Sequence, residues 1–518
     1  MRPSPSPLKG SSAPFSLGVA PSLEDLFAVA EAGRAVSLPA FRRKRLLASR
    51  RLLLKLAAEG RPIYGVNTGF GELASRRIPD GQLKALQRNL VLSHACGVGQ
   101  PLGPAEARAV LFLRANELAR GFSGVRPELV LLMARLLDAG VAPVIPSRGS
   151  VGASGDLAPM AHMALLLIGQ GEAYDNGAKT TASAALRRAR LKAAELQAKE
   201  GLALLNGTQA MQGVGGLALH QAFRVFRAAQ LAGAMSLEAM TGTPVPFAQA
   251  LQRLKPHPGQ GAAARALRGL LAQSEIRESH RDNDPRVQDP YSLRCMPQVH
   301  GATLEALEAA RRTVETEMGS VTDNPLVVGR QVLSGGNFHG QALSFAFDFA
   351  AIALTALGNI SERRVFQLIS GQAPRLTPFL ARNPGFESGW MIAQVAAAAL
   401  ASENKALAHP ASADSVPTSA NKEDFVSMGM GSALKLKRVV WNAAQIAAIE
   451  LLCAAQGVEV HAPLRPGRGV EQGLKLLRAR VSRSQGDEVL SGKMEHARDL
   501  ILNGYFEGVV TPHLPWGR

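Results

Sequence analysis

Cysteine is scarce in this chain of 518 residues. Only three cysteines occur, Cys96, Cys295 and Cys453, and they lie far apart. Their small, odd number argues against a framework of disulfide bonds and suits a reducing compartment. We therefore expect a cytoplasmic protein. Residues 1–14 are rich in Ser and Pro and lack the apolar core of a signal peptide, so they are predicted to form a loose tail.

Aromatic residues make up only 5% of the chain, and acidic residues are outnumbered by basic ones, 41 to 58, which gives a net charge of +17. The basic residues cluster at 42–51 and 465–483. Neither cluster carries the array of aromatic side chains or the zinc-finger spacing that would point to nucleic acid. The clusters therefore favour solvated helix faces, and the charge excess would help to attract an anionic substrate. A basic RNA-binding scaffold is kept as the remote alternative.

Long hydrophobic runs and the common cofactor motifs are absent. The most apolar stretch, 343–357, is interrupted by Asp348 and falls short of the roughly 18 to 20 residues that span a membrane, so it predicts a buried helix. No GxxxxGK[ST] loop, HExxH motif or paired-cysteine spacing occurs. Ser154 lies in Gly-Ala-Ser-Gly, which differs from the Gly-x-Ser-x-Gly of hydrolases. We expect no metal, no nucleotide cofactor and no membrane contact.

The composition that is present indicates a large, mainly α-helical globular protein. Hydrophobic residues make up 46% and charged residues 19%, so most of the chain must be buried. Apolar residues recur at helical spacing in 23–58, 82–92, 105–118, 128–137 and 157–167. Longer Ala/Leu-rich segments at 222–240, 302–318, 340–368, 389–407 and 425–455 predict a bundle of long helices. Short strands are expected within the first 210 residues, for instance around 62–66 and 141–145.

These patterns divide the chain into four segments. The tail at 1–14 precedes a smaller N-terminal α(+β) domain at 15–210. The long-helix bundle follows at 211–460, and a helical segment at 461–518 ends the chain. A length above 500 residues is too great for one hydrophobic core, so several packed units are expected.

A glycine-rich loop precedes the helix expected at 157–167, with Asp156 as its N-cap. Its glycines recur at every third position: Gly149, Gly152 and Gly155. One interpretation is an anion-binding loop at a helix N-terminus. In the other, the amide of Gly155 closes on the carbonyl of Ala153 and two waters are lost, one from Ser154, which leaves an electrophilic methylene. The residues alone leave both interpretations open.

The segment 149–159, Gly-Ser-Val-Gly-Ala-Ser-Gly-Asp-Leu-Ala-Pro, closely resembles the signature of the aromatic amino acid ammonia-lyases. Its Ala153-Ser154-Gly155 matches the tripeptide that forms the family's 4-methylidene-imidazol-5-one (MIO) group. The resemblance runs from the motif at 64–71 to the one at 421–424, with Met160 as a conservative departure. It implies a small amino acid substrate and a homotetramer whose active sites are built from several subunits.

The resemblance also implies roles for individual residues. Tyr64 stands at the position of the catalytic tyrosine that removes the β-proton. Arg294 matches the arginine that binds the substrate carboxylate, a task suited to a bidentate guanidinium. The resemblance also assigns a catalytic role to Tyr291. The residues expected to line the pocket are Asn206, Gln288 and Phe338.

Two positions, His94 and Glu423, bear on the choice of substrate. Together with the matches at 92–94 and 402–405, they resemble the histidine ammonia-lyase branch, which implies elimination of ammonia from L-histidine to give trans-urocanate. Relatives specific for phenyl rings carry glutamine in place of the glutamate. Phe425 departs from the histidine that many histidine-specific members carry there. A phenylalanine or tyrosine ammonia-lyase, or an aminomutase, is therefore the nearer alternative.

Overall fold

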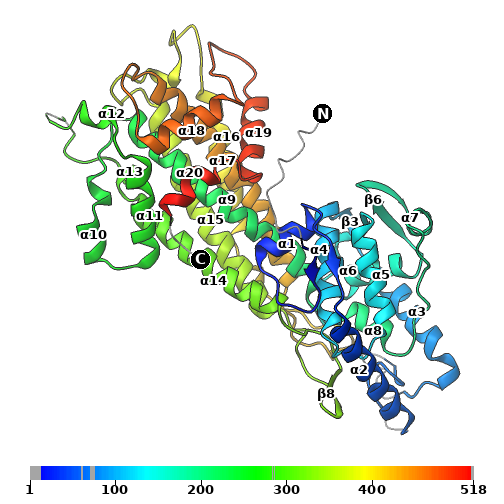
Figure 1. Cartoon of the computed structure of the whole chain (residues 1–518). Helices are drawn as coiled ribbons and strands as arrows, with labels where there is room; N and C mark the ends of the chain where they lie inside the picture. The colour runs from blue at the N-terminus through cyan, green and yellow to red at the C-terminus, as the bar shows by residue number, and fades with distance from the viewer. Residues whose placement is uncertain (1–12, 60–61, 70–75, 283, 285, 515–518) are drawn as a thin grey trace. The chain divides into compact units, whose positions relative to one another are not determined.

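The structure is a computed structural model of the chain. It describes residues 13–59, 62–69, 76–282, 284 and 286–514, so residues 1–12 of the expected tail lie outside the described part. Helices dominate, and the described strands form four small sheets (Figure 1). The predicted fold class, mainly α with few strands, is confirmed, although one strand pair lies at 326–333, outside the N-terminal part where strands were expected.

Two compact units make up the chain. Unit 1 comprises Met1–His220, Arg311–Asp348 and Pro410–Leu434, and unit 2 comprises Gln221–Ala310, Phe349–His409 and Lys435–Arg518. Unit 1 thus combines the whole of the expected N-terminal domain, 15–210, with two segments from later in the sequence. Four long helices contribute residues to both units: α9 (Gln209–Ala239), α14 (Met296–Met318), α15 (Gln341–Ile369) and α17 (Gly429–Glu459).

Unit 1 contains the shorter helices of the N-terminal part. They are α1 (Leu23–Ala30), α2 (Ala40–Ala58), α3 (Leu83–His94), α4 (Pro104–Ala119), α5 (Pro127–Asp138), α6 (Leu157–Leu167), α7 (Ala182–Arg188) and α8 (Glu200–Leu205), with the 3-10 turns η2 (Asp80–Gln82) and η5 (Ala411–Ala413). Local sequence explains several helix starts. Ser22 and Asp25 form a capping box at α1, and proline occupies the first position of α4 and α5.

The strands of unit 1 are short. Strand β1 (Phe15–Ser16) pairs in parallel with β2 (Val36–Ser37), and β3 (Val98–Pro101) pairs antiparallel with β5 (Pro146–Arg148). The order β4 (Val141–Pro143), β6 (Glu172–Asp175), β7 (Ala178–Thr181) forms an antiparallel sheet with Ala142 opposite Tyr174, and β8 (Leu326–Val328) pairs with β9 (Gln331–Leu333).

The two strand predictions had different outcomes. The one at 141–145 is confirmed for Val141–Pro143. The one near 62–66 was wrong, because these residues form a turn. The Val66 amide donates to the carbonyl of Ile63 (3.0 Å), and the Asn67 side chain accepts from the Ile63 amide (2.7 Å). Such local bonds from an asparagine side chain compete with strand pairing.

Unit 2 has no named strand among its described residues. Its own helices are α10 (Gln249–Leu254), α11 (Pro258–Leu270), α12 (Glu275–Glu278), α13 (Tyr291–Arg294), α16 (Met391–Leu407), α18 (Arg468–Arg478), α19 (Ser491–Leu502) and α20 (Glu507–Val510), with η3 (Val245–Phe247), η4 (Pro378–Leu380) and η6 (Thr511–His513). All five long segments predicted from Ala/Leu periodicity are helical. Helix α9 begins 13 residues earlier than expected, at Gln209.

Helices α15 and α17 are long and apolar enough to cross a membrane by length and composition. The most apolar part of α17 is 94% buried within the fold and that of α15 is 61% buried, as in core helices of globular proteins. Asp348 of α15 is buried and accepts a hydrogen bond from the Ser412 amide (2.7 Å). The stretch 343–357 therefore lies in a helix, and the one acidic residue of the stretch is hydrogen-bonded inside the protein.

The two basic clusters are only partly solvated. In α2, Arg50 is buried and donates to backbone carbonyls at 2.7 and 3.0 Å, and Arg45 lies over the ring of Phe122 at 4.1 Å. In the C-terminal cluster, Arg478 pairs with Glu459 at 2.6 Å. The prediction of solvated helix faces was therefore wrong for Arg50, which instead joins α2 to neighbouring loops.

Candidate active site

A cavity of about 480 Å³ lies in unit 1. It brings together five predicted site residues from distant parts of the sequence: Tyr64, His94, Ser154, Asn206 and Glu423. The remaining lining residues are Gly69, Arg76, Ile78, Leu86, Asn89, Leu90, Ser93, Leu157, Leu202, Leu205 and Ser419. Polar side chains thus share a partly apolar cavity with Ser154, the usual composition of a site for a small molecule.

The glycine-rich loop has an unusual backbone at the residues matched to the prosthetic group. Ser154 has φ +49° and Gly155 has φ +78°, both in the left-handed region. Gly155 forms a parallel bridge with Gly207, and a Cβ on Gly155 would lie only 2.2 Å from the Gly207 carbonyl oxygen. Only glycine fits at this position. Ala153 belongs to the same loop but is not among the residues that line the cavity.

Asp156 follows the loop and stands at the N-cap position of α6, but its carboxylate makes no capping bond to that helix. It accepts instead from the Ser150 hydroxyl (2.9 Å) and from the Met211 amide (2.8 Å). Burial raises the pKa of Asp156 to about 6, against the opposing effect of these bonds. Asp156 therefore occupies the predicted N-cap position, but the predicted capping bond was wrong, because its side chain instead joins the loop to the start of α9.

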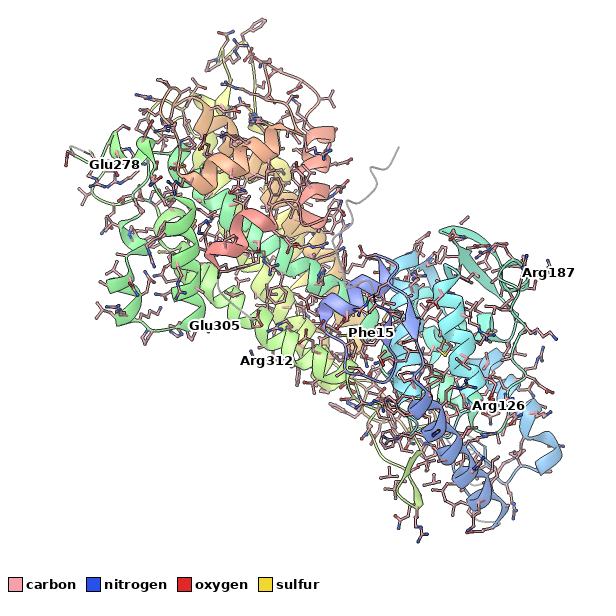
Figure 2. The ribbon with its side chains drawn as sticks, in the orientation of Figure 1. Phe15, Arg126, Arg187, Glu278, Glu305 and Arg312 are labelled. Atoms are coloured by element: carbon pink, nitrogen blue, oxygen red, sulfur yellow. The ribbon has the colours of Figure 1, made fainter. Side chains whose placement is uncertain are left out.

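Helix α8 positions Asn206, which is its C-cap. At the other end, Arg126, labelled in Figure 2, binds both carboxylate oxygens of the buried Glu200 at 2.9 and 2.7 Å. The Asn206 side chain donates from Nδ2 to the Ser154 carbonyl (3.1 Å). Its Oδ1 is buried and has no hydrogen-bond partner within the described part of the chain. Asn206 therefore holds the loop and keeps one acceptor for a ligand.

The side chain of Gln87, in α3, holds the turn that carries Tyr64. The fully buried Gln87 amide donates to the carbonyl of Gly65 (3.3 Å) and accepts from the amide of Leu202 in α8 (3.2 Å). Val66 and Ile63 of the same turn pack in a small apolar cluster with Leu53 of α2. One side chain thus links the Tyr64 turn, α3 and α8, which all border the cavity.

Glu423 lies opposite the loop, in a tight hairpin with Thr418. Its carboxylate accepts from the hydroxyls of Ser154 (2.5 Å), Thr418 (2.9 Å) and Ser419 (2.7 Å). Partial burial would raise the pKa of Glu423, but the three hydroxyl donors outweigh it, and the pKa lies below its ordinary value. At neutral pH the cavity therefore contains a carboxylate anion next to Ser154.

His94 is the last residue of α3 and borders the same cavity. Burial lowers its pKa from the ordinary 6.5, although the negative charge of Glu423 acts in the opposite direction. Its Nδ1 lies 3.0 Å from the Ser93 hydroxyl. At neutral pH His94 is a neutral imidazole, which can donate or accept a hydrogen bond at its free nitrogen according to its tautomer.

Three predicted site residues lie outside this cavity and belong to unit 2. Gln288 and Tyr291 are exposed, Tyr291 to 71%. The Arg294 guanidinium lies over the Tyr291 ring at 4.5 Å, and its Nε has no hydrogen-bond partner within the described residues. Phe338 of unit 1 is half-buried in the turn before α15 and is also absent from the cavity lining.

Phe425, the residue that complicates the choice of substrate, is not part of the cavity lining either. It is 62% exposed and stacks on His339, with ring centroids 5.9 Å apart and planes 14° apart. Its carbonyl oxygen lies 3.2 Å from Nε2 of the same histidine. Within the chain, Phe425 therefore contributes no aromatic wall to the cavity around Glu423.

Several lining residues were missed by the sequence analysis. Leu86, Asn89, Leu90 and Ser93 lie on one face of α3 with His94, at helical spacing, so the position of His94 would have identified that face. Arg76 had no such signal. It enters the site because Thr68 and Arg77 form an antiparallel bridge, and the Gly69 amide donates to the Arg76 carbonyl (2.9 Å).

The family model for aromatic amino acid lyases matches residues 22–479. The chain therefore belongs to the aromatic amino acid lyase family, and it is a carbon–nitrogen lyase. It is 52% identical over 499 residues to the histidine ammonia-lyase of Sorangium cellulosum, covering 94% of this chain and 97% of that one. It is 50% identical over 484 residues to the histidine ammonia-lyase of Myxococcus xanthus, covering 93% and 95%.

Solved structures agree with this assignment. The histidine ammonia-lyase from Trypanosoma cruzi has a TM-score of 0.90 to this chain at 40% identity, with 97% of this chain and 96% of that chain covered. The tyrosine aminomutase from Streptomyces globisporus has a TM-score of 0.91 at 34% identity, with 98% and 100% covered. The fold alone thus does not separate substrates, whereas the similar sequences favour the histidine branch.

Proposed function

We propose that this protein is a histidine ammonia-lyase that eliminates ammonia from L-histidine to give trans-urocanate. The observation that carries the proposal is the ionised Glu423, 2.5 Å from Ser154 in a cavity that also contains His94 and Tyr64. A carboxylate and a neutral imidazole suit a substrate ring that both donates and accepts hydrogen bonds. The relatives named histidine ammonia-lyase, at 50 to 52% identity over most of the chain, support the same substrate.

The family's MIO group is proposed to form from Ala153, Ser154 and Gly155. Ring closure joins the Gly155 nitrogen to the Ala153 carbonyl carbon. One water takes that carbonyl oxygen with the amide hydrogens of Ser154 and Gly155, and the other takes the Ser154 hydroxyl with its α-hydrogen. The left-handed backbone and the lack of space beside Gly155 fit such a compact ring. The group supplies an electrophilic carbon that makes the substrate amine a better leaving group.

The chain's own residues then supply binding and proton transfer. Tyr64 is proposed to take the β-proton as general base, and the free Oδ1 of Asn206 to accept from the substrate amine. Glu423 is proposed to accept from the substrate imidazole. When Ser154 loses its hydroxyl, Glu423 loses its 2.5 Å donor, so Oε1 becomes available to that ring. Substrate held in this way reacts with less entropic penalty.

Residues Gln288, Tyr291 and Arg294, which lie outside the cavity, are proposed to reach it from another subunit of a homotetramer. Arg294 has a nitrogen without a partner within the described residues, and it suits a carboxylate. Unit 2 also leaves large apolar side chains exposed on two helices: Phe349, Ile352 and Phe366 on α15, and Ile392 and Val395 on α16. Exposed apolar surface of this kind favours association.

A cytoplasmic location is likewise a proposal, supported by three unpaired cysteines.

Co-expression of Ser154→Ala and Arg294→Ala chains tests the shared site. Each variant alone is expected to be strongly impaired. Mixed assemblies, isolated through a different affinity tag on each chain, should regain a measurable part of the wild-type rate, because some sites receive an intact Ser154 from one chain and an intact Arg294 from another. Mixed assemblies no more active than their parents would contradict sites built from several chains.

Substrate choice is tested by measuring ammonia release from L-histidine, L-phenylalanine and L-tyrosine in parallel. We expect a strong preference for L-histidine, up to about 10⁴-fold, because a phenyl ring would leave buried polar groups unpaired. Comparable turnover of phenylalanine would overturn the histidine assignment and favour the phenylalanine or tyrosine branch. Rearranged β-amino acid as the main product would instead favour an aminomutase.

Glu423→Gln is expected to lower histidine turnover by about 10- to 100-fold, the effect of weakening one charge-assisted hydrogen bond of about 1.5–3 kcal/mol. Any side activity on phenylalanine should fall less, since an amide is less costly to bury beside a phenyl ring. Glu195→Gln, at an exposed carboxylate of unit 1, serves as the control and should change neither rate. Equal losses on both substrates would argue against contact between Glu423 and the substrate ring.

A further inference from the structure

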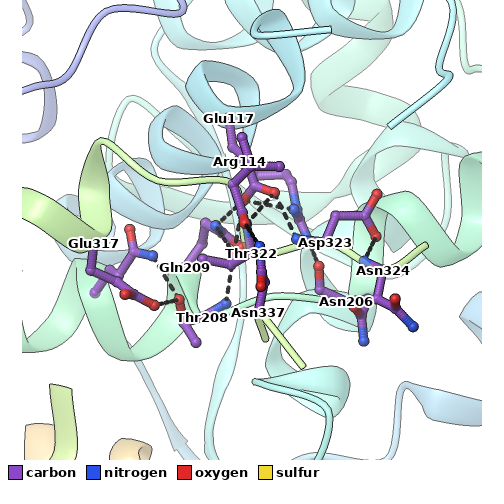
Figure 3. Close-up of polar contacts among 12 residues, drawn as sticks. Arg114, Glu117, Asn206, Thr208, Gln209, Glu317, Thr322, Asp323, Asn324 and Asn337 are labelled. Carbon is purple, nitrogen blue, oxygen red and sulfur yellow. Dashed lines mark hydrogen bonds and ion pairs between the residues drawn. The ribbon is translucent and has the colours of Figure 1, made fainter. Parts of the chain in front are cut away.

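Unit 1 also contains a buried network of charged side chains, none of which lines the cavity (Figure 3). Arg114 and Glu117 of α4 form an ion pair at 3.1 Å and are 0% and 2% exposed. Lys199 and Asp323 form a second pair at 2.7 Å and are equally buried. All four residues belong to unit 1, and their charges balance.

The Glu117 carboxylate accepts hydrogen bonds from three segments of the chain. Besides Arg114, it accepts from the side chain of Gln209 at the start of α9, and from the hydroxyl (3.0 Å) and amide (3.0 Å) of Thr322. The Asp323 amide also donates to it (2.9 Å). Because Asp323 binds Lys199 through its side chain, the two ion pairs are linked through the 322–323 backbone. The network therefore joins α4, the start of α9 and the 322–324 segment.

This network surrounds the peptide of Asn206 and Gly207. The Arg114 guanidinium donates to the Asn206 carbonyl. A Cβ on Gly207 would lie 2.8 Å from the Thr322 hydroxyl and 2.9 Å from Nη2 of Arg114, so the polar side chains leave no space beside it. The position of this peptide is set by Arg114 and Thr322.

The two residues of this peptide bind the loop on both sides of Gly155, Asn206 through its side-chain amide and Gly207 through its carbonyl. Asn206 donates to the carbonyl of Ser154 (3.1 Å), the residue before it, and the Gly207 carbonyl accepts from the amide of Asp156 (2.9 Å), the residue after it. Ring closure requires the Gly155 nitrogen to approach the Ala153 carbonyl carbon. A backbone fixed at both neighbours favours that approach, because less conformational freedom has to be lost.

We infer that Arg114, Glu117 and Thr322 are positioning residues for formation of the prosthetic group. Arg114 clamps the Asn206–Gly207 peptide against the loop, and Glu117 with Thr322 fixes Arg114 and the start of α9. A buried ion pair rarely stabilises a fold more than apolar side chains of similar size, whereas it imposes a defined geometry. This inference rests on the proposed MIO function.

The test follows ring formation by intact mass during cell-free synthesis of the full chain. Wild-type chains should become two waters lighter, with the loss mapped to the peptide that contains Ser154. Arg114→Lys keeps the charge but lacks the fork that reaches both Glu117 and Asn206, and Thr322→Val removes one hydroxyl at nearly constant volume. Both variants are expected to lose the two waters at least about tenfold more slowly.

Arg108→Lys is the matched control. Arg108 lies on the same helix and donates to three backbone carbonyls at 3.0 to 3.2 Å, those of Val29, Ala30 and Leu137, none of which belongs to the loop. The Arg108→Lys variant should have a lower midpoint of thermal unfolding than the wild type but should lose the two waters at the same rate. A network that is only structural would give the same result for Arg108→Lys and Arg114→Lys.

The outcomes separate the two proposals. A wild-type chain of full encoded mass would contradict the MIO group itself. If wild-type chains lose two waters and folded Arg114→Lys chains lose them equally fast, the positioning role is wrong. If Arg114→Lys fails to fold, the rate measured for Thr322→Val decides, with the same expected delay and the same contradicting result.

Discussion

Replacing Ser154 by alanine is expected to abolish the loss of two waters and nearly all ammonia release. Without the hydroxyl, no methylidene carbon can form from the loop. The fold should persist, because Ser154 lies at the border of a cavity and the change removes one oxygen without emptying the core. Intact mass, circular dichroism and the rate on L-histidine measure the three expectations.

Ser183→Ala on α7 is a suitable control, since Ser183 is exposed and its hydroxyl bonds only to Thr181 in the described structure. It should keep both the mass deficit and the rate. Full activity of Ser154→Ala, or full activity of a wild-type chain that retains its encoded mass, would contradict a prosthetic group made from this loop.

Tyr64→Phe is expected to lower kcat by about 10² to 10⁴-fold with little change in KM, the effect of removing a general base that acts only in the transition state. Phenols lose their proton near pH 10 in water, so the wild-type rate should rise from neutral into alkaline pH. The variant should lose that rise. Initial rates between pH 7 and 10 measure both effects.

Tyr174→Phe provides the comparison. Tyr174 is a buried tyrosine of the same unit whose hydroxyl donates to the Leu102 carbonyl (2.8 Å), and neither of these two residues lines the cavity. Loss of the Tyr174 hydroxyl should lower the stability of the fold and leave the dependence of the rate on pH unchanged. A Tyr64→Phe enzyme with raised KM and unchanged kcat would assign Tyr64 to binding instead of proton transfer.

The sequence alone determined the fold class and singled out the glycine-rich loop. Apolar spacing of 3.6 residues is a local property, so it predicted the ends of α15 and α16 to within two residues and those of α14 and α17 to within six. The glycine spacing at 149–155 indicated a chain forced into tight conformations, and the resemblance of the surrounding residues supplied the chemistry. Turns were harder to predict from the sequence. Near Tyr64 the composition favoured a strand, but the hydrogen bond between the Asn67 side chain and the Ile63 amide stabilises a turn.

Only the tertiary structure decided which distant residues share the cavity and which do not. Glu423 had the sequence features of a surface residue, yet a hairpin brings its carboxylate to Ser154, 269 positions earlier. Asp156 had those of a helix cap, yet the Ser150 hydroxyl and the Met211 amide bind it. The Arg114–Glu117 pair had only the i,i+3 spacing of an ordinary helix-surface pair, because its role depends on burial and on donors from three separate segments. Spacing along the chain encodes helices, whereas contacts between remote segments arise only when the whole unit packs.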